Sequence, residues 1–177
     1  YTDATGWGDD NALTLTQIAP ELWSYSLSLL PDTYLEYAFM NADGRWRDPF
    51  NKRLITNGMG KMNHWFDMPA AHHTDLTYRK RGVAHGLLTE HKIDGGFAIV
   101  GEQRSVYLYH PPTTAPVPLL VVLDGKDYAT RAKLPNIVDN LIAQKRIRPI
   151  ALAMPQHGGQ ARFVEYLCSD STLAFLT

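Results

Sequence analysis

The sequence is poor in cysteine, in net charge and in long hydrophobic runs. Its 177 residues contain a single cysteine, Cys168, which excludes an internal disulfide and is compatible with a reducing compartment. The formal net charge of -1 argues against a dedicated nucleic-acid binder. No apolar run approaches the roughly 20 residues of a membrane span, so no membrane association is expected. The first ten residues carry no signal-peptide pattern, so the expected location is the cytoplasm, or the periplasm if a signal was lost.

Apolar residues are abundant enough for a packed core, and the first 71 residues have an all-β pattern. Hydrophobic residues make up 45% of the chain, which argues against disorder and allows one large domain or two small ones. Residues 22–29 alternate apolar and polar side chains, which predicts a strand with one buried face. The sequence Asn41-Ala42-Asp43-Gly44 favours a hairpin turn. Further strands are expected at 35–40, 45–47 and 63–68, with a turn at 57–60.

From residue 72 onward the pattern becomes that of an α/β domain. The aliphatic run 118–123 ends at Asp124-Gly125, which predicts a strand buried on both faces, as in a parallel sheet. Residues 134–147 carry apolar side chains at helical spacing, and 150–154 form a second aliphatic run. Together these segments predict one βαβ unit. Extended segments are also expected before it, at 74–81, 83–89, 97–100 and 104–109.

A series of short motifs runs along nearly the whole chain in a definite order. They are Trp7 in a Gly-Trp-Gly turn, residues 35–39, 43–46, 48–51 and 105–112, Leu123-Asp124-Gly125, and Arg162 with Glu165-Tyr166. Each motif is weak by itself, but their order and spacing resemble the enterochelin (enterobactin) esterase-like family. This family is the esterase-D branch of the α/β-hydrolases.

The resemblance implies two domains. Residues 1–71 would form an immunoglobulin-like β-sandwich of the early-set type, with its first strand expected to be missing. Residues 72–177 would form the first part of an α/β-hydrolase domain, so the fold class is α/β. The implied activity is serine-dependent hydrolysis of carboxylic esters without a cofactor. Its best-known substrates are iron-siderophore trilactones, so the expected partner is a small-molecule ester, with ferric siderophores among the candidates.

The sequence departs from this family at the catalytic serine. A nucleophile of this type sits in a Gly-x-Ser-x-Gly turn between a strand and a helix, and the acid and the histidine follow it in the chain. The six serines, at positions 24, 26, 28, 105, 169 and 171, do not lie in such a motif. The nucleophile, acid and histidine are therefore expected beyond Thr177. The chain is interpreted as truncated and inactive by itself.

The loop after the run 118–123 is the first candidate site. By resemblance, the backbone N–H of Lys126 supplies one donor of the oxyanion hole, and Gly125 lets the backbone approach the substrate closely. The alternative is an ordinary turn that ends a strand.

The segment 156–162 is the second candidate, because open α/β sheets bind ligands at the carboxyl ends of their strands. Here His157 would donate or accept a hydrogen bond, and Arg162 would bind an anionic group of the substrate. The alternative is a structural loop in which Arg162 pairs with Glu165.

Two other sets of residues raise hypotheses outside these loops. His72-His73 with Asp75 is more typical of a surface linker than of a metal site, so no metal is predicted. Trp7, Trp23, Trp46 and Trp65 all lie in the first domain, where core packing is the expected role and stacking on sugars is the alternative. Two alternative functions follow. One is a non-catalytic carbohydrate- or partner-binding module, and the other is an assembly protein that associates through an unfinished sheet edge or with the remainder of the protein.

Overall fold

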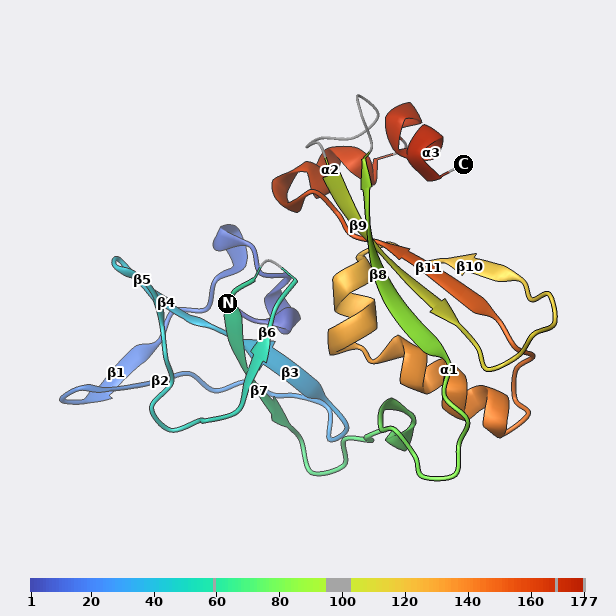
Figure 1. The fold of residues 1–177 in the computed structure, drawn as a ribbon. Coiled ribbons are helices and arrows are strands. Elements are labelled where there is room, and N and C mark those ends of the chain that lie inside the picture. The colour runs from blue at the N-terminus through green and yellow to red at the C-terminus, as the bar shows by residue number, and fades with distance from the viewer. Residues whose placement is uncertain (59, 95–102, 168, 177) are drawn as a thin grey trace. The chain divides into compact units, whose positions relative to one another are not determined.

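The computed structural model describes residues 1–58, 60–94, 103–167 and 169–176 (Figure 1). The chain divides into two compact units, Tyr1–His73 and Thr74–Thr177. The division falls two residues beyond the expected boundary. The extended segment expected at 97–100 and Cys168 lie outside the described residues. None of the helices in the described ranges is long and apolar enough to cross a membrane.

The N-terminal unit consists of short antiparallel strands. A three-stranded sheet has the order β3-β7-β6, and two separate ribbons are formed by β1 with β2 and by β4 with β5. The strands are β1 Thr16–Ala19, β2 Leu22–Ser24, β3 Tyr34–Tyr37, β4 Phe39–Asn41, β5 Gly44–Trp46, β6 Leu54–Thr56 and β7 Met62–Asp67.

The hairpin predicted at 41–44 is confirmed. Asn41 and Gly44 are cross-strand partners at the end of the β4–β5 ribbon. The Asn41 side-chain oxygen accepts the Asp43 N–H at 3.0 Å, and Gly44 has a φ of 113°, a conformation that glycine adopts without steric cost.

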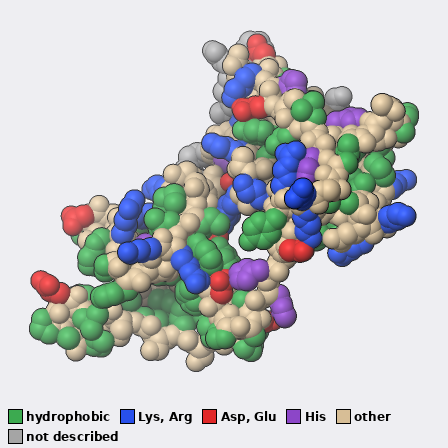
Figure 2. All heavy atoms as spheres, turned by 60° about the horizontal axis from the view of Figure 1, so that its bottom comes forward, with side chains coloured by type: hydrophobic (Ala, Val, Ile, Leu, Met, Phe, Trp, Pro, Cys, Tyr) green, Lys and Arg blue, Asp and Glu red, His purple; other side chains and the backbone are tan. Residues whose placement is uncertain are grey.

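The strand predicted over 22–29 is largely absent. Only Leu22–Ser24 is a strand, and its three residues are exposed. Among the described strands it pairs only with β1, and all residues of both strands are exposed, so the ribbon has no buried face in this part of the structure. The alternation of apolar and polar residues therefore gave a wrong prediction. Trp23 is 49% exposed and Trp46 is 57% exposed, so core packing is also the wrong role for these two tryptophans. Figure 2 shows hydrophobic side chains at the surface.

The C-terminal unit is built on a four-stranded sheet with the order β10-β11-β9-β8. Strands β10 and β11 are parallel, and helix α1 connects them, which confirms the predicted βαβ unit. Strand β9 runs antiparallel to both β11 and β8. The elements are η3 Asp75–Thr77, β8 Leu87–Asp94, β9 Gln103–His110, β10 Leu119–Val121, η4 Asp127–Arg131, α1 Leu134–Ala143, β11 Ala151–Pro155, η5 Gly159–Ala161, α2 Arg162–Glu165 and α3 Asp170–Leu176.

The core of this unit lies between the sheet and α1 (Figure 1). Leu152 and Met154 of β11 and Tyr109 of β9 are at most 1% exposed, and Val138 of α1 packs against them. This burial is the main favourable term that holds the end of β11 in place.

Strand β10 is an exposed edge strand. Leu119 is 62%, Leu120 49% and Val121 42% exposed, so the prediction of a strand buried on both faces is wrong. Among the described strands, β10 pairs only with β11. The prediction assumed that an aliphatic strand has other elements packed on both of its faces.

The segment 74–81 is also not the extended strand that its sequence suggested. Residues Asp75–Thr77 form a 3₁₀ helix. The Asn140 side chain, buried on α1, donates hydrogen bonds to the carbonyls of Leu76 at 2.7 Å and of Tyr78 at 2.9 Å. The Leu76 and Tyr78 carbonyls thus accept hydrogen bonds from a side chain of α1, where in a sheet they would accept them from a neighbouring strand.

Candidate functional site

The candidate site lies where β10 and β11 end. Because the two strands are parallel, their carboxyl ends meet at one edge of the sheet, the usual ligand-binding edge of an open α/β sheet. After β10, the Val122 N–H still donates to the Ala153 carbonyl at 2.9 Å, so the pairing continues up to the turn. At Asp124 the backbone has a φ of 60°, which is unusual for a residue other than glycine.

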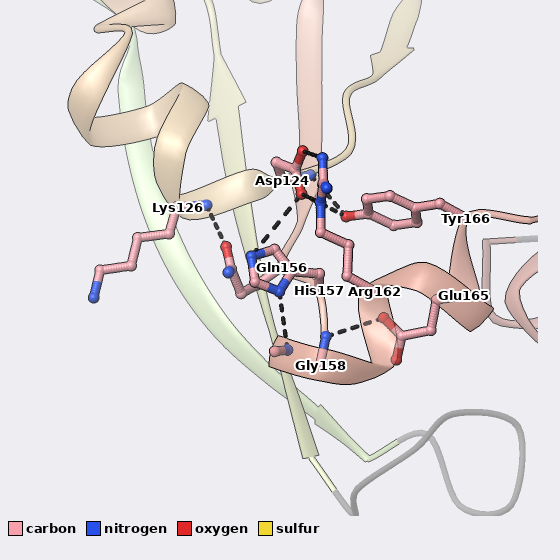
Figure 3. A network of polar contacts seen from close by, with 9 residues as sticks. Asp124, Lys126, Gln156, His157, Gly158, Arg162, Glu165 and Tyr166 are labelled. Atoms are coloured by element: carbon pink, nitrogen blue, oxygen red, sulfur yellow. Dashed lines mark hydrogen bonds and ion pairs between the residues drawn. The ribbon is translucent and has the colours of Figure 1, made fainter. Parts of the chain in front are cut away.

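Asp124 is held in this conformation by two side chains from the segment after β11 (Figure 3). The guanidinium of Arg162 donates two parallel hydrogen bonds, Nε to Oδ1 at 2.9 Å and Nη2 to Oδ2 at 2.8 Å. The Tyr166 hydroxyl accepts the Asp124 N–H at 3.0 Å and donates to Oδ1 at 3.1 Å. A two-pronged Arg–carboxylate pair fixes orientation as well as distance, so the turn is restrained at both its backbone and its side chain.

The electrostatics of this network favour its ionised form. The hydrogen bonds from Arg162 lower the pKa of Asp124 below its ordinary value, although partial burial opposes this shift. The same hydrogen bonds raise the pKa of Arg162. Burial raises the pKa of Tyr166 to about 12, with a smaller contribution from the charge of Asp124, although the hydrogen bond from the Asp124 N–H opposes the shift. Asp124 is therefore a carboxylate at neutral pH and Tyr166 remains a hydroxyl, so each hydrogen bond keeps its donor and acceptor.

Gly125 lies directly against β11. A Cβ at this position would be 2.0 Å from the Met154 carbonyl oxygen, far inside contact distance. Only glycine allows the loop to pass this close to the strand. Gly125 thus serves the packing of the loop on β11, and the close approach of a substrate that was predicted for it stays a prediction.

The Lys126 N–H already has an acceptor from within the chain. It donates to Oε1 of Gln156 at 2.7 Å, in a contact that is exposed to solvent. The Lys126 side chain points away from the network of Asp124 and Arg162 (Figure 3). An N–H at the surface that binds a carbonyl oxygen can also bind the oxygen of a ligand. Its predicted role in an oxyanion hole stays a prediction.

His157 lies within the supporting network and is 9% exposed. Its Nδ1 accepts the Gly159 N–H at 2.9 Å, and its Nε2 is 4.0 Å from Oδ1 of Asp124. Because Nδ1 is an acceptor, the neutral ring carries its hydrogen on Nε2, on the side of Asp124. The substrate contact proposed for His157 is untested.

Arg162 and Glu165 each bind another partner, so the pairing expected in the alternative reading is wrong, although Arg162 does have a structural role. Arg162 binds Asp124, and Glu165 binds Arg104 of β9 at 2.5 Å in a buried ion pair. The second Glu165 oxygen accepts the Gly158 N–H at 3.0 Å. The Arg162 guanidinium therefore has its own carboxylate inside the loop, which makes Arg162 a support for the turn. Its binding of a substrate anion stays a prediction.

The remaining candidates lie elsewhere. His73 is an exposed residue whose Nε2 is 3.4 Å from Asp67. Within the described residues, no group of three His, Cys, Asp or Glu side chains is arranged to hold a metal ion. Sugar stacking by the exposed Trp23 and Trp46 stays a prediction.

Three residues that support the site were given no role from the sequence. Gln156 was included only as the first residue of the segment 156–162, Tyr166 only as part of a motif, and Arg104 only as part of an expected strand. Arg104 gave one signal that could have been used, since a lone arginine in a strand facing a domain core needs a buried acid.

Sequence comparisons give no family, whereas structural comparisons give a clear likeness. No family model matches the chain, and no curated protein matches it significantly. The ferric enterobactin esterase of Salmonella typhimurium matches 92% of this chain with a TM-score of 0.64 and 18% sequence identity. The enterobactin esterase of Shigella flexneri, solved in the presence of 2,3-dihydroxy-N-benzoyl-serine, matches 92% with a TM-score of 0.64 and 17% identity.

The match covers only part of those proteins. This chain spans 48% of the Salmonella structure and 49% of the Shigella structure, about half of their length. A further structure of the Shigella enzyme, solved in the presence of enterobactin, matches 75% of this chain with a TM-score of 0.58. At this level of identity the likeness establishes a shared fold. The resemblance to enterochelin esterases indicated by the sequence motifs is thus confirmed at the level of the fold.

Proposed function

We propose that this chain is part of a carboxylic ester hydrolase of the enterochelin esterase type, and that the Lys126 N–H binds the carbonyl oxygen of the ester. The observation that carries the proposal is the exposed Lys126 N–H, which binds a carbonyl oxygen at 2.7 Å at the carboxyl ends of two parallel strands. The shared fold of the enterobactin esterases supports the same reaction class.

The proposed role of the Lys126 N–H follows from the negative charge that develops on the ester carbonyl oxygen during hydrolysis. When a nucleophile attacks an ester, the carbonyl oxygen becomes negatively charged, and a fixed N–H at hydrogen-bond distance stabilises that charge. Asp124, held by Arg162 and Tyr166, restrains the turn that presents the Lys126 N–H. In α/β-hydrolases the second N–H belongs to the residue after the nucleophile. The 177 residues contain no Gly-x-Ser-x-Gly, so we propose that they do not hydrolyse esters by themselves.

The substrate we propose is a small-molecule ester, with ferric siderophores as the finer proposal. It is supported by the names of the similar structures, one of which was solved with enterobactin and another with 2,3-dihydroxy-N-benzoyl-serine. The charge of Arg162 is balanced by Asp124. We therefore propose that the exposed, positively charged side chain of Lys126 attracts an anionic ligand. We further propose that Tyr1–His73 is an immunoglobulin-like domain of the early-set type, supported by its antiparallel pairings.

Two substitutions at residue 126 test the proposal. Lys126 has a φ of −62°, which matches the angle fixed by proline, and the preceding residue is a glycine. Lys126→Pro therefore removes the N–H with little change of backbone shape, while Lys126→Ala removes only the side chain. The carboxylate of 2,3-dihydroxy-N-benzoyl-serine can form a charge-assisted hydrogen bond with this N–H. We therefore expect this compound, measured by calorimetry, to bind about tenfold more weakly to Lys126→Pro than to Lys126→Ala. Equal affinities for the two variants would contradict the role of the N–H.

A further inference from the structure

The side chain of Gln156 occupies the position in front of the Lys126 N–H. Its Oε1 is 2.7 Å from the Lys126 nitrogen. The Gln156 backbone is fixed separately, because its own N–H donates to the Ser105 carbonyl at 2.8 Å. Only rotations within the Gln156 side chain are therefore needed to uncover the Lys126 N–H, and the contact is already exposed to solvent.

We propose that Gln156 is a displaceable cap, whose side-chain oxygen holds the place of the ligand oxygen on the Lys126 N–H and leaves when the ligand binds. This inference rests on the proposed function. The amide oxygen of glutamine and the carbonyl oxygen of an ester are both neutral sp² acceptors, so their exchange on one N–H is nearly balanced.

The cap has a consequence for selectivity. A neutral ester carbonyl gains little by replacing Gln156, whereas an oxygen with full negative charge forms a stronger, charge-assisted hydrogen bond with the same N–H. Displacing Gln156 costs the same free energy for either ligand, but the oxyanion gains more from the N–H and so exceeds this cost more easily. Interactions that strengthen only as charge develops are the ones that accelerate a reaction. Gln156 thus sets a minimum hydrogen-bond strength that a ligand oxygen must exceed to bind the Lys126 N–H.

The first test of the cap needs no ligand. In the full 177-residue chain, Gln156→Ala should expose the Lys126 N–H and raise its hydrogen-exchange rate, measured by NMR, by about tenfold. The matched control is Gln144→Ala, which removes an exposed glutamine side chain after the end of α1. We expect the control to leave the exchange of Lys126 unchanged. An unchanged rate in Gln156→Ala would overturn the proposal.

The second test uses 2,3-dihydroxy-N-benzoyl-serine as the probe. We expect about three- to tenfold tighter binding by Gln156→Ala than by the wild type and by Gln144→Ala. Gln156→Glu should bind more weakly than the wild type, because its carboxylate is a stronger acceptor for the N–H. Equal affinities in all four proteins would overturn the displacement. If none of them binds the probe, the displacement fails together with the proposed function, while the exchange rates still decide whether Gln156 covers the N–H.

Discussion

Gly125 lies so close to Met154 that a Cβ on residue 125 would be 2.0 Å from the Met154 carbonyl oxygen. The neighbouring carbonyl carbon would be only 2.6 Å away, so the obstacle is the backbone of β11, which cannot turn aside as a flexible side chain can. This contact packs the loop directly against β11 and so fixes the position of the N–H of the next residue, Lys126.

Gly125→Ala should therefore destabilise the C-terminal unit by about 3 kcal/mol. The control is Gly8→Ala, at a site with a φ of −78° and no atom within 4 Å of the added Cβ, where we expect little change. All four tryptophans lie within Tyr1–His73, so their fluorescence reports only the N-terminal unit. Hydrogen exchange of β11 amides in urea is the appropriate measurement. A loss below about 0.5 kcal/mol would contradict the close packing.

Acid should weaken the ion pair between Asp124 and Arg162 that restrains the turn at Asp124. Because Arg162 lowers the pKa of Asp124 in the folded protein, the stabilisation is fully present above the ordinary value of 3.8 and is lost as the pH falls through the lowered value. The Arg162 side chain is 40% exposed, so solvent screens the pair and the expected contribution is about 1 kcal/mol.

Asp124→Asn should accordingly lose about this amount of stability at pH 7 and depend less on pH below about 4. Urea unfolding of the C-terminal unit at pH 7, 4 and 2.5 measures both effects. Arg162→Lys, which keeps the charge but lacks the two-pronged geometry, should lie between the wild type and Asp124→Asn at pH 7. An acid dependence of Asp124→Asn as steep as that of the wild type would show that another group is responsible.

The buried carboxylate of Asp139 should contribute more to the stability of the C-terminal unit than the Asp124–Arg162 pair does. Asp139 is 3% exposed and accepts the Gly86 N–H at 3.0 Å and the Tyr109 hydroxyl at 2.5 Å, while His85 Nδ1 lies 3.0 Å from its second oxygen. Asp139→Ala removes both oxygens and leaves the Gly86 N–H and the Tyr109 hydroxyl without this acceptor, so we expect a loss of about 3 kcal/mol. Tyr109→Phe removes a single donor and should cost about 1–2 kcal/mol. Equal losses for the two variants, measured by urea unfolding, would contradict a shared centre at Asp139.

The ion pair between Arg104 and Glu165 should support the loop around His157. Their side chains are 5% and 9% exposed, and Glu165 also accepts the Gly158 N–H at 3.0 Å. Glu165→Gln leaves the buried Arg104 without this carboxylate, so we expect a loss of about 3 kcal/mol and faster exchange of the Gly158 and Gly159 amides. If exchange there stays at the wild-type rate, Glu165 does not hold this loop.

Local patterns in the sequence predicted the elements whose causes are local. The β4–β5 hairpin follows from Asn41 to Gly44, and α1 follows from apolar spacing. The burial of 118–123 was predicted wrongly, because burial depends on which neighbours a strand has and composition does not reveal them. The segment 74–81 was wrongly predicted to be extended for a similar reason. Its Tyr78 carbonyl accepts a hydrogen bond from Asn140, which lies 62 residues later in the chain.

The candidate site was predicted in part. The resemblance and the positions after two predicted strands placed Gly125, Lys126, His157 and Arg162 in two loops at the ends of strands, where the structure also has them. The partners could not be predicted: the Arg162–Asp124 pair joins residues 38 apart, and the Gln156–Lys126 contact joins residues 30 apart. Long-range pairings of this kind depend on the folded arrangement of two strands, and no local pattern encodes them.

The most direct test of the proposed function is an NMR titration of the 177-residue chain with 2,3-dihydroxy-N-benzoyl-serine, followed at the Lys126 amide. The account predicts a saturable downfield shift of the Lys126 amide proton, together with a shift of the Gln156 side-chain NH₂ as Gln156 is displaced. A Lys126 signal that stays in place at concentrations where other residues saturate would contradict binding at this N–H, as would the absence of any shift.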